Sequence, residues 1–254
     1  MDVAATWSLF DELAAEVRRR VESVGPQGGE RGTRSGQYVL DLAADDAVVP
    51  MLLDAGFGVM SEESGRHEPQ RSVCVVVDPV DGSTNAARGL PCWATSLCAV
   101  DAEGPWVATV VDHSRAITYR AARGLGATRT AGDGAPESIA VAAGLPLSDA
   151  VVAVNGRSAS WPAARQLRAL GSAAIELCLV AEGALDGYLN LDGDSHGSWD
   201  YLGALLVLTE AGGAAGDAQG RDLVTLDPDA RRCIIGASGP AMLDALSAPM
   251  GAAR

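Results

Sequence analysis

The feature that most constrains the fold is a run of apolar residues that ends in an acidic turn. Residues 73–77 read VCVVV, and a short run rich in β-branched residues predicts a buried strand. The next five residues, 78–82, read DPVDG. Pro79 cannot extend a central strand and Gly82 allows unusual backbone dihedrals, so we expect the chain to turn here.

Two carboxylates, those of Asp78 and Asp81, leave this turn close together. Like charges at short range are costly unless a positive group lies between them, and residues 78–85 (DPVDGSTN) contain no Lys or Arg. Oxygen ligands suit Mg²⁺, Mn²⁺ or Ca²⁺. The turn therefore predicts a site for a hard divalent cation, and the alternative is an ordinary solvated Asp-Pro and Asp-Gly turn.

The 254-residue chain is acidic, with a formal net charge of −14 and 48% apolar residues. This length fits one large domain or two joined halves. Long basic stretches are missing from the sequence, which argues against nucleic acid or a membrane as partner. No apolar run is long enough to span a membrane, and the first 25 residues do not read as a signal peptide. Five cysteines without a Cys-x-x-Cys pair favour reduced thiols in a cytoplasmic protein.

In the amino-terminal part, the apolar pattern predicts two helices and a largely antiparallel set of strands. Helical spacing favours a helix over 2–24, and a second helix is expected to begin at Asp45 and to end near Gly56. Pro50 fits this helix only in its first turn or at a kink. The expected strands are 57–60, 73–78, 94–101, 106–112 and 116–121.

The carboxyl-terminal part alternates between strand and helix patterns. Gly, Pro and Ala cluster near 135–148, which predicts the boundary between the two halves there. The expected elements are strands at 150–154, 185–191 and 232–237, a short strand that ends at Gly171, and helices near 160–169, over 173–182 and over 200–211.

Three further acidic residues are candidates for the cation site. Glu62 follows a predicted strand and would add a third carboxylate; a solvated acidic pair with Glu63 is the alternative. Asp200 follows Trp199 and opens an apolar helix, where it is either an N-cap or a ligand that reaches across from the second half. Asp45 is either an N-cap or a base that orients water.

Two turns of small residues offer surfaces for a ligand. The amides of Gly82, Ser83 and Thr84 lie where a turn leads into a helix, and such N–H groups favour an anion. Residues 171–174 (GSAA) form a second turn of this kind, although small residues there also suit helix packing. We therefore expect phosphate at the first turn and substrate contacts at Gly171, Ser172 and Ala173.

Taken in order along the chain, these motifs resemble those of the inositol monophosphatase family. They are Glu62-Glu63, the DPVDGSTN turn at 78–85, GSAA at 171–174, and Trp199-Asp200 followed by EAGG at 210–213. The resemblance extends from about Ala4 to Gly236. Members of this family are Mg²⁺-dependent, lithium-sensitive phosphomonoesterases, related to fructose-1,6-bisphosphatase and bisphosphate nucleotidases.

The resemblance implies a five-layered α/β/α/β/α sandwich of the sugar-phosphatase type. Residues 1–140 would form an α+β half with an antiparallel sheet and most of the metal ligands. Residues 141–254 would form an α/β half with a mixed sheet that supplies Asp200. The resemblance also implies two or three Mg²⁺ ions, with Mn²⁺ as a substitute, and a homodimer.

Roles for single residues follow from the same resemblance. Ser83 takes the place of the family's Thr, and Asp45 and Ser83 would orient and deprotonate the attacking water, with Glu62 also part of the catalytic set. The amides of Gly82 and Ser83 would hold the phosphate. The implied metal ligands are Glu62, Asp78, the carbonyl of Val80, Asp81 and Asp200.

The side that would hold the leaving group departs from the family pattern. Asn190 stands near the position at which inositol-specific members carry a Glu, and Asp192 is the nearest acid. Ala86 stands where an aromatic residue is usual. With Asn190 and Asp192 as candidate substrate contacts, we expect hydrolysis of a small polyol, sugar or nucleoside phosphate, with histidinol phosphate or a specialised metabolite as further candidates.

Two other functions stay open. Residues 193–197 (GDSHG) match the G-x-S-x-G elbow of serine hydrolases, with Ser195 as nucleophile. The triad needs a His later in the chain, none follows His196, and we expect His196 not to reach its neighbour Ser195. The other alternative is a catalytically silent relative that serves as a binding subunit. Such a relative would lack one of the metal-ligating residues of the family, and this sequence retains all of them.

Overall fold

The computed structural model describes residues 2–34, 37–158 and 161–251. Its helices are α1 (Val3–Val24), α2 (Val39–Asp54), α3 (Ser83–Ala87), α4 (Ala173–Ala181), α5 (Leu202–Glu210) and α6 (Pro240–Gly251). Short 3₁₀ turns lie at Gly25–Gly29, Leu147–Asp149 and Ser198–Asp200. The strands are β1 (Gly58–Ser61), β2 (Gly65–His67), β3 (Cys74–Asp81), β4 (Ala94–Asp101), β5 (Gly104–Asp112), β6 (Ile117–Ala122), β7 (Ala127–Ala131), β8 (Glu137–Ser138), β9 (Val151–Asn155), β10 (Gln166–Arg168), β11 (Gly187–Asn190), β12 (Ala214–Asp217) and β13 (Ile234–Ala237).

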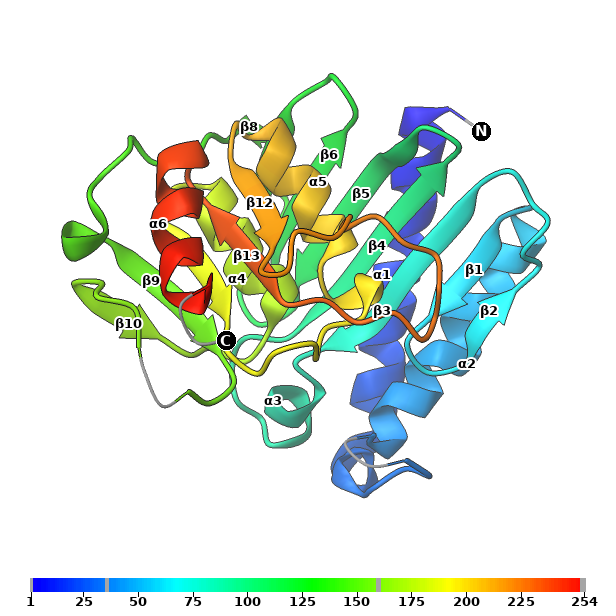
Figure 1. The fold of residues 1–254 in the computed structure, drawn as a ribbon. Helices are drawn as coiled ribbons and strands as arrows, with labels where there is room; N and C mark the ends of the chain where they lie inside the picture. The colour runs from blue at the N-terminus through cyan, green and yellow to red at the C-terminus, as the bar shows by residue number, and fades with distance from the viewer. Residues whose placement is uncertain (1, 35–36, 159–160, 252–254) are drawn as a thin grey trace.

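Helices and sheets alternate in five layers, as Figure 1 shows. Helices α1 and α2 cover one face of an eight-stranded sheet, and α4 and α5 cover its other face. A five-stranded sheet packs on the far side of α4 and α5, and α6 closes the molecule. The predicted α/β/α/β/α sandwich is confirmed.

The outer helices α1 and α2 are held by an amphipathic pattern. Asp2 caps α1 by accepting a hydrogen bond of 2.8 Å from the amide of Ala5. Phe10, Leu13 and Val17 lie on one face of α1 and are fully buried against α2 and the sheet. This layer supports the rear of the strand that carries the acidic turn.

The eight-stranded sheet has the order β2-β1-β3-β4-β5-β6-β7-β8. Its pairs are antiparallel except that β1 runs parallel to β3. All eight residues of β3 are buried, in keeping with its apolar run. The strand continues through Pro79 to Asp81, later than expected, because the register shifts between Asp78 and Asp81 and so no regular pairing is required of Pro79.

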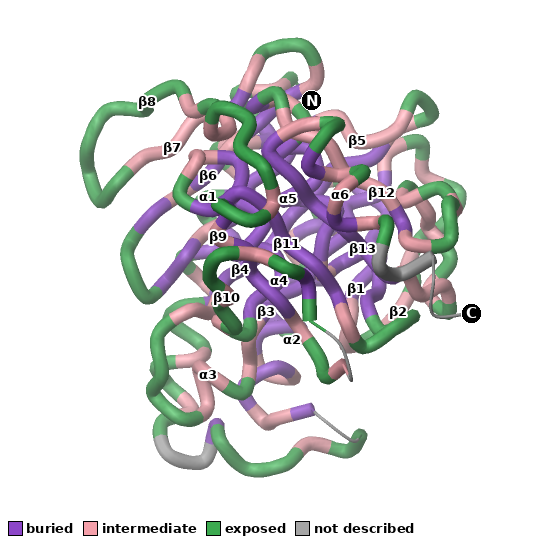
Figure 2. Tube along the Cα trace, turned by 60° about the vertical axis from the view of Figure 1, so that its left-hand side comes forward, coloured by how far each residue is buried: buried purple, intermediate pink, exposed green. Residues whose placement is uncertain are grey.

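Helices α4 and α5 form a central layer between the two sheets. Every residue of α4 is buried, and so are residues 202–208 of α5. A helix that is apolar on all sides needs apolar partners on all sides, and the two sheets provide them. Figure 2 shows this layer in the buried interior, with exposed residues confined to the outer loops and outer faces.

The five-stranded sheet has the order β10-β9-β11-β13-β12. Strands β10, β9 and β11 run parallel, whereas β11, β13 and β12 pair antiparallel, so the sheet is mixed as expected. Met242 and Leu246 of α6 pack on its outer face. The helix expected near 160–169 is wrong, because residues 166–168 pair with β9 and form the edge strand β10; residues 159–160 lie outside the described residues.

Two predicted helix starts are also wrong. Helix α2 begins at Val39 rather than Asp45, because Asp41 accepts a hydrogen bond of 2.8 Å from the amide of Tyr38 and so closes the first turn earlier. Asp45 and Pro50 therefore lie inside the helix. Helix α5 begins at Leu202, and Asp200 belongs to the 3₁₀ turn before it. No described helix is both long and apolar enough to span a membrane.

Candidate active site

The acidic turn at the end of β3 is shaped by a glycine. Gly82 has φ +86°, and a Cβ atom there would lie 2.7 Å from the carbonyl oxygen of Cys92. A side chain at this position is excluded both by backbone strain and by contact with a rigid main-chain atom. Asp78 Oδ1 accepts a hydrogen bond of 2.9 Å from the amide of Val80, which fixes the first carboxylate of the turn.

Three carboxylates from distant segments converge beside this turn. Glu62, Asp78 and Asp200 each offer an oxygen atom, and these atoms lie within 4.8 Å of one another. Glu62 follows β1, which is parallel to β3, and its amide donates a hydrogen bond of 3.2 Å to the carbonyl of Val77. Parallel strands end at the same edge of a sheet, so the pairing of β1 with β3 brings Glu62 to Asp78.

Asp200 joins this cluster from the other half of the chain. Its Oδ2 accepts a hydrogen bond of 2.7 Å from the amide of Gly197, within its own 3₁₀ turn. The turn packs against β3 and β4. The predicted convergence of Glu62, Asp78 and Asp200 is therefore what the structure shows.

Burial and neighbouring acidic charges raise the pKa of each of the three carboxylates. The pKa of Glu62 is raised well above its ordinary value by burial, and further by the charges of Asp200 and Glu63. Burial also raises the pKa of Asp78, with the charges of Glu62 and Asp81 adding to the effect. Burial and the charge of Asp81 raise the pKa of Asp200 to about 8. Asp78 is buried and Glu62 and Asp200 are half-buried, and three acidic groups whose ionised forms are disfavoured in this way fit a cation site.

Asp81 is oriented by the other half of the molecule. Its Oδ2 accepts hydrogen bonds from Ser172 Oγ at 2.6 Å and from the amide of Ala174 at 2.8 Å. These bonds oppose the effect of burial, which raises the pKa of Asp81 to about 6. Asp81 is not among the three carboxylates within 4.8 Å. Its second oxygen, Oδ1, is left for a ligand.

The GSAA turn faces the acidic turn rather than an open surface. Ser172 is 1% exposed, and Ala173 is buried as well. A Cβ on Gly171 would lie 3.2 Å from Nδ2 of Asn85, which donates to the carbonyl of Leu170 at 2.8 Å. The contacts of Gly171, Ser172 and Ala173 in the structure thus position Asp81, and their substrate contact stays a prediction.

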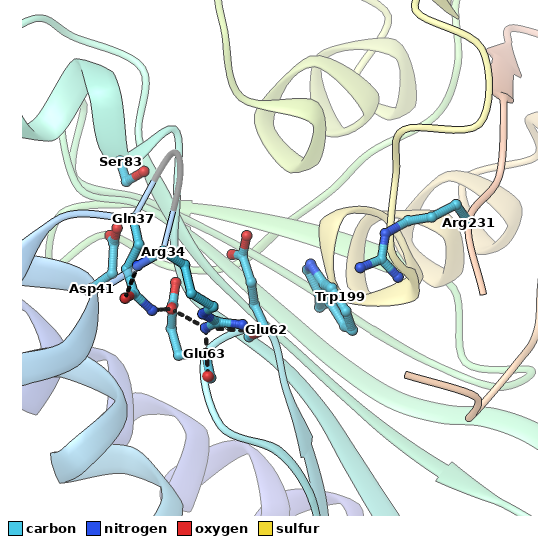
Figure 3. Close-up of a pocket in the computed structure, with 8 residues that line it drawn as sticks. All are labelled: Arg34, Gln37, Asp41, Glu62, Glu63, Ser83, Trp199 and Arg231. Carbon is cyan, nitrogen blue, oxygen red and sulfur yellow. Dashed lines mark hydrogen bonds and ion pairs between the residues drawn. The ribbon is translucent and has the colours of Figure 1, made fainter. Parts of the chain in front are cut away.

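A cavity of about 220 Å³ opens beside the carboxylate cluster. Figure 3 shows Ser83 and Asp41 at one end, Trp199 and Arg231 at the other, and Glu62 between them. The residues that line it are Arg34, Gln37, Asp41, Glu62, Glu63, Ser83, Trp199 and Arg231.

Asp41, and not Asp45, lies beside Ser83. Asp41 and Ser83 both line the cavity, Asp41 Oδ1 is buried without a hydrogen-bond partner among the described residues, and burial raises the pKa of Asp41 to about 7. Asp45 accepts a hydrogen bond from Ser61 Oγ on the inner side of α2 and does not line the cavity. The sequence analysis missed Asp41 because it placed the start of α2 six residues too late. An acidic residue three positions after Tyr38, the N-cap, was the available signal.

Arg34 and Gln37 form one wall of the cavity around Glu63. Arg34 Nη2 lies 2.8 Å from Glu63 Oε2, and Gln37 Nε2 donates to the same oxygen. Glu63 is therefore a partner of Arg34 and not a member of the carboxylate cluster. The sequence analysis missed Arg34, Gln37 and Arg231, because their segments carry no motif that points to a site.

Asn190 and Asp192 lie outside the cavity. Asn190 is fully buried, and its Nδ2 donates to the carbonyl of Gly193 at 2.9 Å and to Ser195 Oγ at 3.0 Å. Its Oδ1 accepts from the amide of Asp192 at 3.1 Å. The polar atoms of Asn190 thus brace the loop before Asp200, and nothing in these contacts points to substrate.

Ser195 and His196 contact each other, against our expectation. Ser195 Oγ lies 3.1 Å from His196 Nδ1, and Nε2 of the same ring lies 2.9 Å from the hydroxyl of Tyr188. Among the residues that the structure describes, no carboxylate hydrogen-bonds to this ring, and neither residue lines the cavity. The pair lacks the third member of a catalytic triad and stabilises the loop instead.

Comparison with known proteins identifies one family over nearly the whole chain. The model of the inositol monophosphatase family matches residues 5–249. A fructose-1,6-bisphosphatase/inositol-1-monophosphatase from Thermococcus kodakarensis is 30% identical over 213 residues, which cover 83% of this chain and 80% of the relative. A protein named Nus factor SuhB from Escherichia coli is 29% identical over 206 residues, 76% of each chain.

Solved structures agree on the fold. A Pyrococcus horikoshii protein, described as having similarities for inositol-1 monophosphatase, superposes with a TM-score of 0.86 at 23% identity and covers 97% of this chain and 98% of its own. At that identity the likeness shows the fold alone. Together with the family match, it agrees with the five layers and the acidic cluster described above. The chain therefore belongs to the inositol monophosphatase family, a family of phosphoric monoester hydrolases.

Proposed function

We propose that the protein is a Mg²⁺-dependent phosphomonoesterase that hydrolyses a small polyol, sugar or nucleoside phosphate. The observation that carries this proposal is the convergence of Glu62, Asp78 and Asp200 within 4.8 Å, beside a cavity that Ser83 also lines. The cavity of about 220 Å³ is suited to a small leaving group.

The donor set fits a hard divalent cation. All three side chains offer carboxylate oxygens; Asp78 is buried, Glu62 and Asp200 are half-buried, and neighbouring acidic charges raise the pKa of each. Carboxylates favour Mg²⁺ or Mn²⁺ over softer metals. Glu62, Asp78, Asp81, Asp200 and the carbonyl of Val80 are the proposed ligands of two to three Mg²⁺ ions. When bound, such ions activate water and neutralise the charge of the reacting phosphate.

Asp41 and Ser83 supply the proposed proton acceptor. In this proposal Ser83 would donate its hydroxyl hydrogen to Asp41, whose Oδ1 has no hydrogen-bond partner among the described residues, and the Ser83 oxygen would then accept a hydrogen bond from water. A carboxyl with a pKa of about 7 can take up a proton near neutral pH. The proposed pair is therefore Asp41 and Ser83, with Asp45 replaced by Asp41.

The start of α3 supplies the proposed phosphate cradle. The first amides of a helix have no acceptor within the helix, so those of Ser83 and Thr84 can point to an anion, together with that of Gly82. The closely packed turn at Gly82 fixes their position beside Asp78 and Asp81. Phosphate held here has the carboxylate cluster on one side and the cavity on the other.

A test of the metal site compares Asp78→Asn with the surface variant Asp101→Asn in a phosphate-release assay with Mg²⁺ or EDTA. We expect Asp78→Asn to lose at least about a thousandfold in kcat/KM, about 4 kcal/mol of transition-state stabilisation. Mg²⁺ should raise the Tm of the wild type but not that of Asp78→Asn, because only a binding-competent fold is stabilised. Full turnover in Asp78→Asn, or in EDTA, would refute the proposal.

A second test separates Asp41 from Asp45. Asp41→Asn should lower kcat by about 10²- to 10⁴-fold, the range for loss of a general base. Asp45→Asn should stay close to the wild type, because Asn can still accept from Ser61. If Asp45→Asn is the more damaging variant, the proposed acceptor is wrong.

The alternative proposal is that this protein binds a partner without catalysing a reaction. One relative is named Nus factor SuhB, a name that does not describe an enzyme. Intact candidate ligands favour catalysis, and the EDTA assay decides between the two. Homodimer formation and a cytoplasmic location remain predictions. Light scattering on the purified protein tests the first of them.

A further inference from the structure

Two arginines line the cavity, but only one of them has its charge compensated. Arg34 forms an ion pair of 2.8 Å with Glu63 and also donates to the Glu63 carbonyl. Glu63 is nearly buried, so this pair is a fixed part of the wall. The charge of Arg34 is therefore already used within the protein.

Arg231 is oriented without being neutralised. Its Cζ lies 4.9 Å from the centre of the Trp199 ring, and its Nη1 donates to the carbonyls of Pro228 at 2.8 Å and Ala230 at 2.9 Å. Within residues 2–34, 37–158 and 161–251, no carboxylate forms an ion pair with Arg231, and Nε and Nη2 make no hydrogen bond. A positioned guanidinium thus keeps open donors beside the cavity.

Arg231 lies at the end of the cavity where the leaving group of the substrate would lie. Ser83 and the start of α3 lie at one end of the cavity, Glu62 lies between, and Trp199 and Arg231 lie at the other end (Figure 3). A phosphate held at α3 would direct its alcohol across the cavity. The far end of a small alcohol would then meet Trp199 and Arg231.

On the basis of the proposed function, we propose that Arg231 is a specificity-determining residue that selects phosphate esters whose leaving alcohol carries a second anionic group, a carboxylate or a phosphate. A planar guanidinium binds such oxyanions through two parallel N–H bonds. Trp199 holds the plane of the guanidinium, so little side-chain entropy is lost on binding. The acidic surroundings make this one uncompensated cation the favourable place for a substrate oxyanion.

A purely electrostatic role is the competing explanation. Arg231 lies near Asp200, and its charge stabilises the ionised form of that carboxylate. If this were its only role, removing it would affect every substrate equally. Recognition of the leaving group predicts instead an effect that depends on the charge of the alcohol.

The experiment uses matched esters that differ in one anionic group. Glycerol 3-phosphate is compared with 3-phosphoglycerate, and fructose 1-phosphate with fructose 1,6-bisphosphate. The variants are Arg231→Gln, Arg231→Lys and the control Arg232→Gln. Arg232 is the adjacent arginine; it donates to the carbonyls of Asp222 and Arg231 and does not line the cavity.

Arg231→Gln should lower the ratio of kcat/KM for the anionic ester to that for its partner by about 10- to 100-fold, mainly through KM. Arg231→Lys should restore part of the ratio, and Arg232→Gln should leave it unchanged. Inhibition by glycerate, compared with glycerol, should weaken in Arg231→Gln by a similar factor. The first pair of esters tests a carboxylate and the second a phosphate, so the pair that responds identifies the group.

An unchanged ratio in both pairs, or an equal loss on all four esters, overturns the inference while leaving the proposed function intact. Absence of Mg²⁺-dependent phosphate release from every ester by the wild type overturns the proposed function and the inference with it. Circular dichroism and Tm of each variant show whether a loss reflects unfolding.

Discussion

The two segments that bring carboxylates to the site are held in different ways. The acidic turn at 78–85 is held from the other half, since Ser172 and Ala174 bind Asp81 and the side chain of Asn85 binds the carbonyl of Leu170. The segment 190–200 is held by its own hydrogen bonds and by neighbours in the carboxyl-terminal part of the chain, such as Arg221 and Arg232. Asn190 binds Ser195, and the amide of Gly197 binds Asp200.

This difference shows where the two halves depend on each other. The acidic turn needs α4 in place to orient Asp81, whereas Asp200 has its own local support. The packing of α4 against the eight-stranded sheet therefore completes the acidic turn. Changes in α4 should accordingly affect the proposed metal ligands of β3, although α4 supplies no proposed ligand itself.

The largest effect is expected from glycine substitutions in the two segments. Gly82→Ala meets both a positive φ and the carbonyl of Cys92 at 2.7 Å, so we expect it to cost about 2–4 kcal/mol in unfolding free energy. Gly197 has φ −73°, which alanine can adopt, and the nearest atom to its Cβ would belong to the Trp199 side chain, at 2.3 Å. Gly197→Ala should cost less, about 1–3 kcal/mol.

Urea unfolding followed by far-UV circular dichroism measures both values. Gly89→Ala is the control, because Gly89 has φ +66° but open space around its Cβ position. Gly89→Ala therefore measures the cost of the positive φ alone, without a steric clash. If Gly197→Ala is more destabilising than Gly82→Ala, the Cys92 carbonyl is not the rigid obstacle that we infer.

A smaller effect is expected from Ser172→Ala, which removes the support of Asp81 from the other half. The hydroxyl accepts from the amide of Ile175 at 3.3 Å, as the N-cap of α4, and donates to Asp81. Its loss should cost about 1–2 kcal/mol, the range for an N-cap. The Mg²⁺ concentration for half-maximal activity should also rise, as measured by phosphate release. Ser247→Ala, in α6, is the control; equal behaviour of the two variants would contradict the link between the halves.

The smallest expected effect is a pH dependence of the unfolding free energy that comes from two buried histidines. His113 lies close to the acidic turn, and His196 lies within the segment 190–200. His113 Nε2 lies 2.8 Å from Thr95 Oγ1, which donates to the carbonyl of Pro79 at 2.9 Å. Burial lowers the pKa of His113 to about 3 and that of His196 to about 4. Each histidine therefore favours folding above pH 6.5, and this contribution is lost as the pH falls toward the folded-state pKa.

Between pH 6.5 and 5.5, each histidine should reduce the unfolding free energy by about 1 kcal/mol. Denaturant unfolding at the two pH values tests this against His113→Gln and His196→Gln, in which the corresponding loss should disappear. The buried carboxylates act in the opposite direction, so the comparison between variant and wild type is the informative quantity. If the unfolding free energy falls by the same amount in the wild type and both variants, the two histidines are not the cause of the pH dependence.

The local part of the site could be predicted from the sequence because its determinants are adjacent in the chain. The run at 73–77 is buried as β3, and Gly82 adopts the positive φ that the turn requires. Glu62 follows β1 at the position expected for a third carboxylate. In each case a few neighbouring residues fix the backbone, whatever surrounds them.

Elements whose partners lie far away were predicted less well. The segment 166–168 carries a pattern compatible with helix, and only the edge of β9 makes it a strand. The position of Asp41 beside Ser83 depends on where α2 begins, which a hydrogen bond at Tyr38 decides. A misplaced helix start moved the expected acceptor to Asp45.

The sequence by itself determined the family, the five-layered fold and the three carboxylates that converge at the candidate site, since these follow from local patterns and ordered motifs. Only the tertiary structure decided that Asp41 lines the same cavity as Ser83, that Ser172 holds Asp81, and that Arg231 lacks a carboxylate partner among the described residues. Pairing between side chains depends on distances across the fold, and residue order along the chain does not specify those distances.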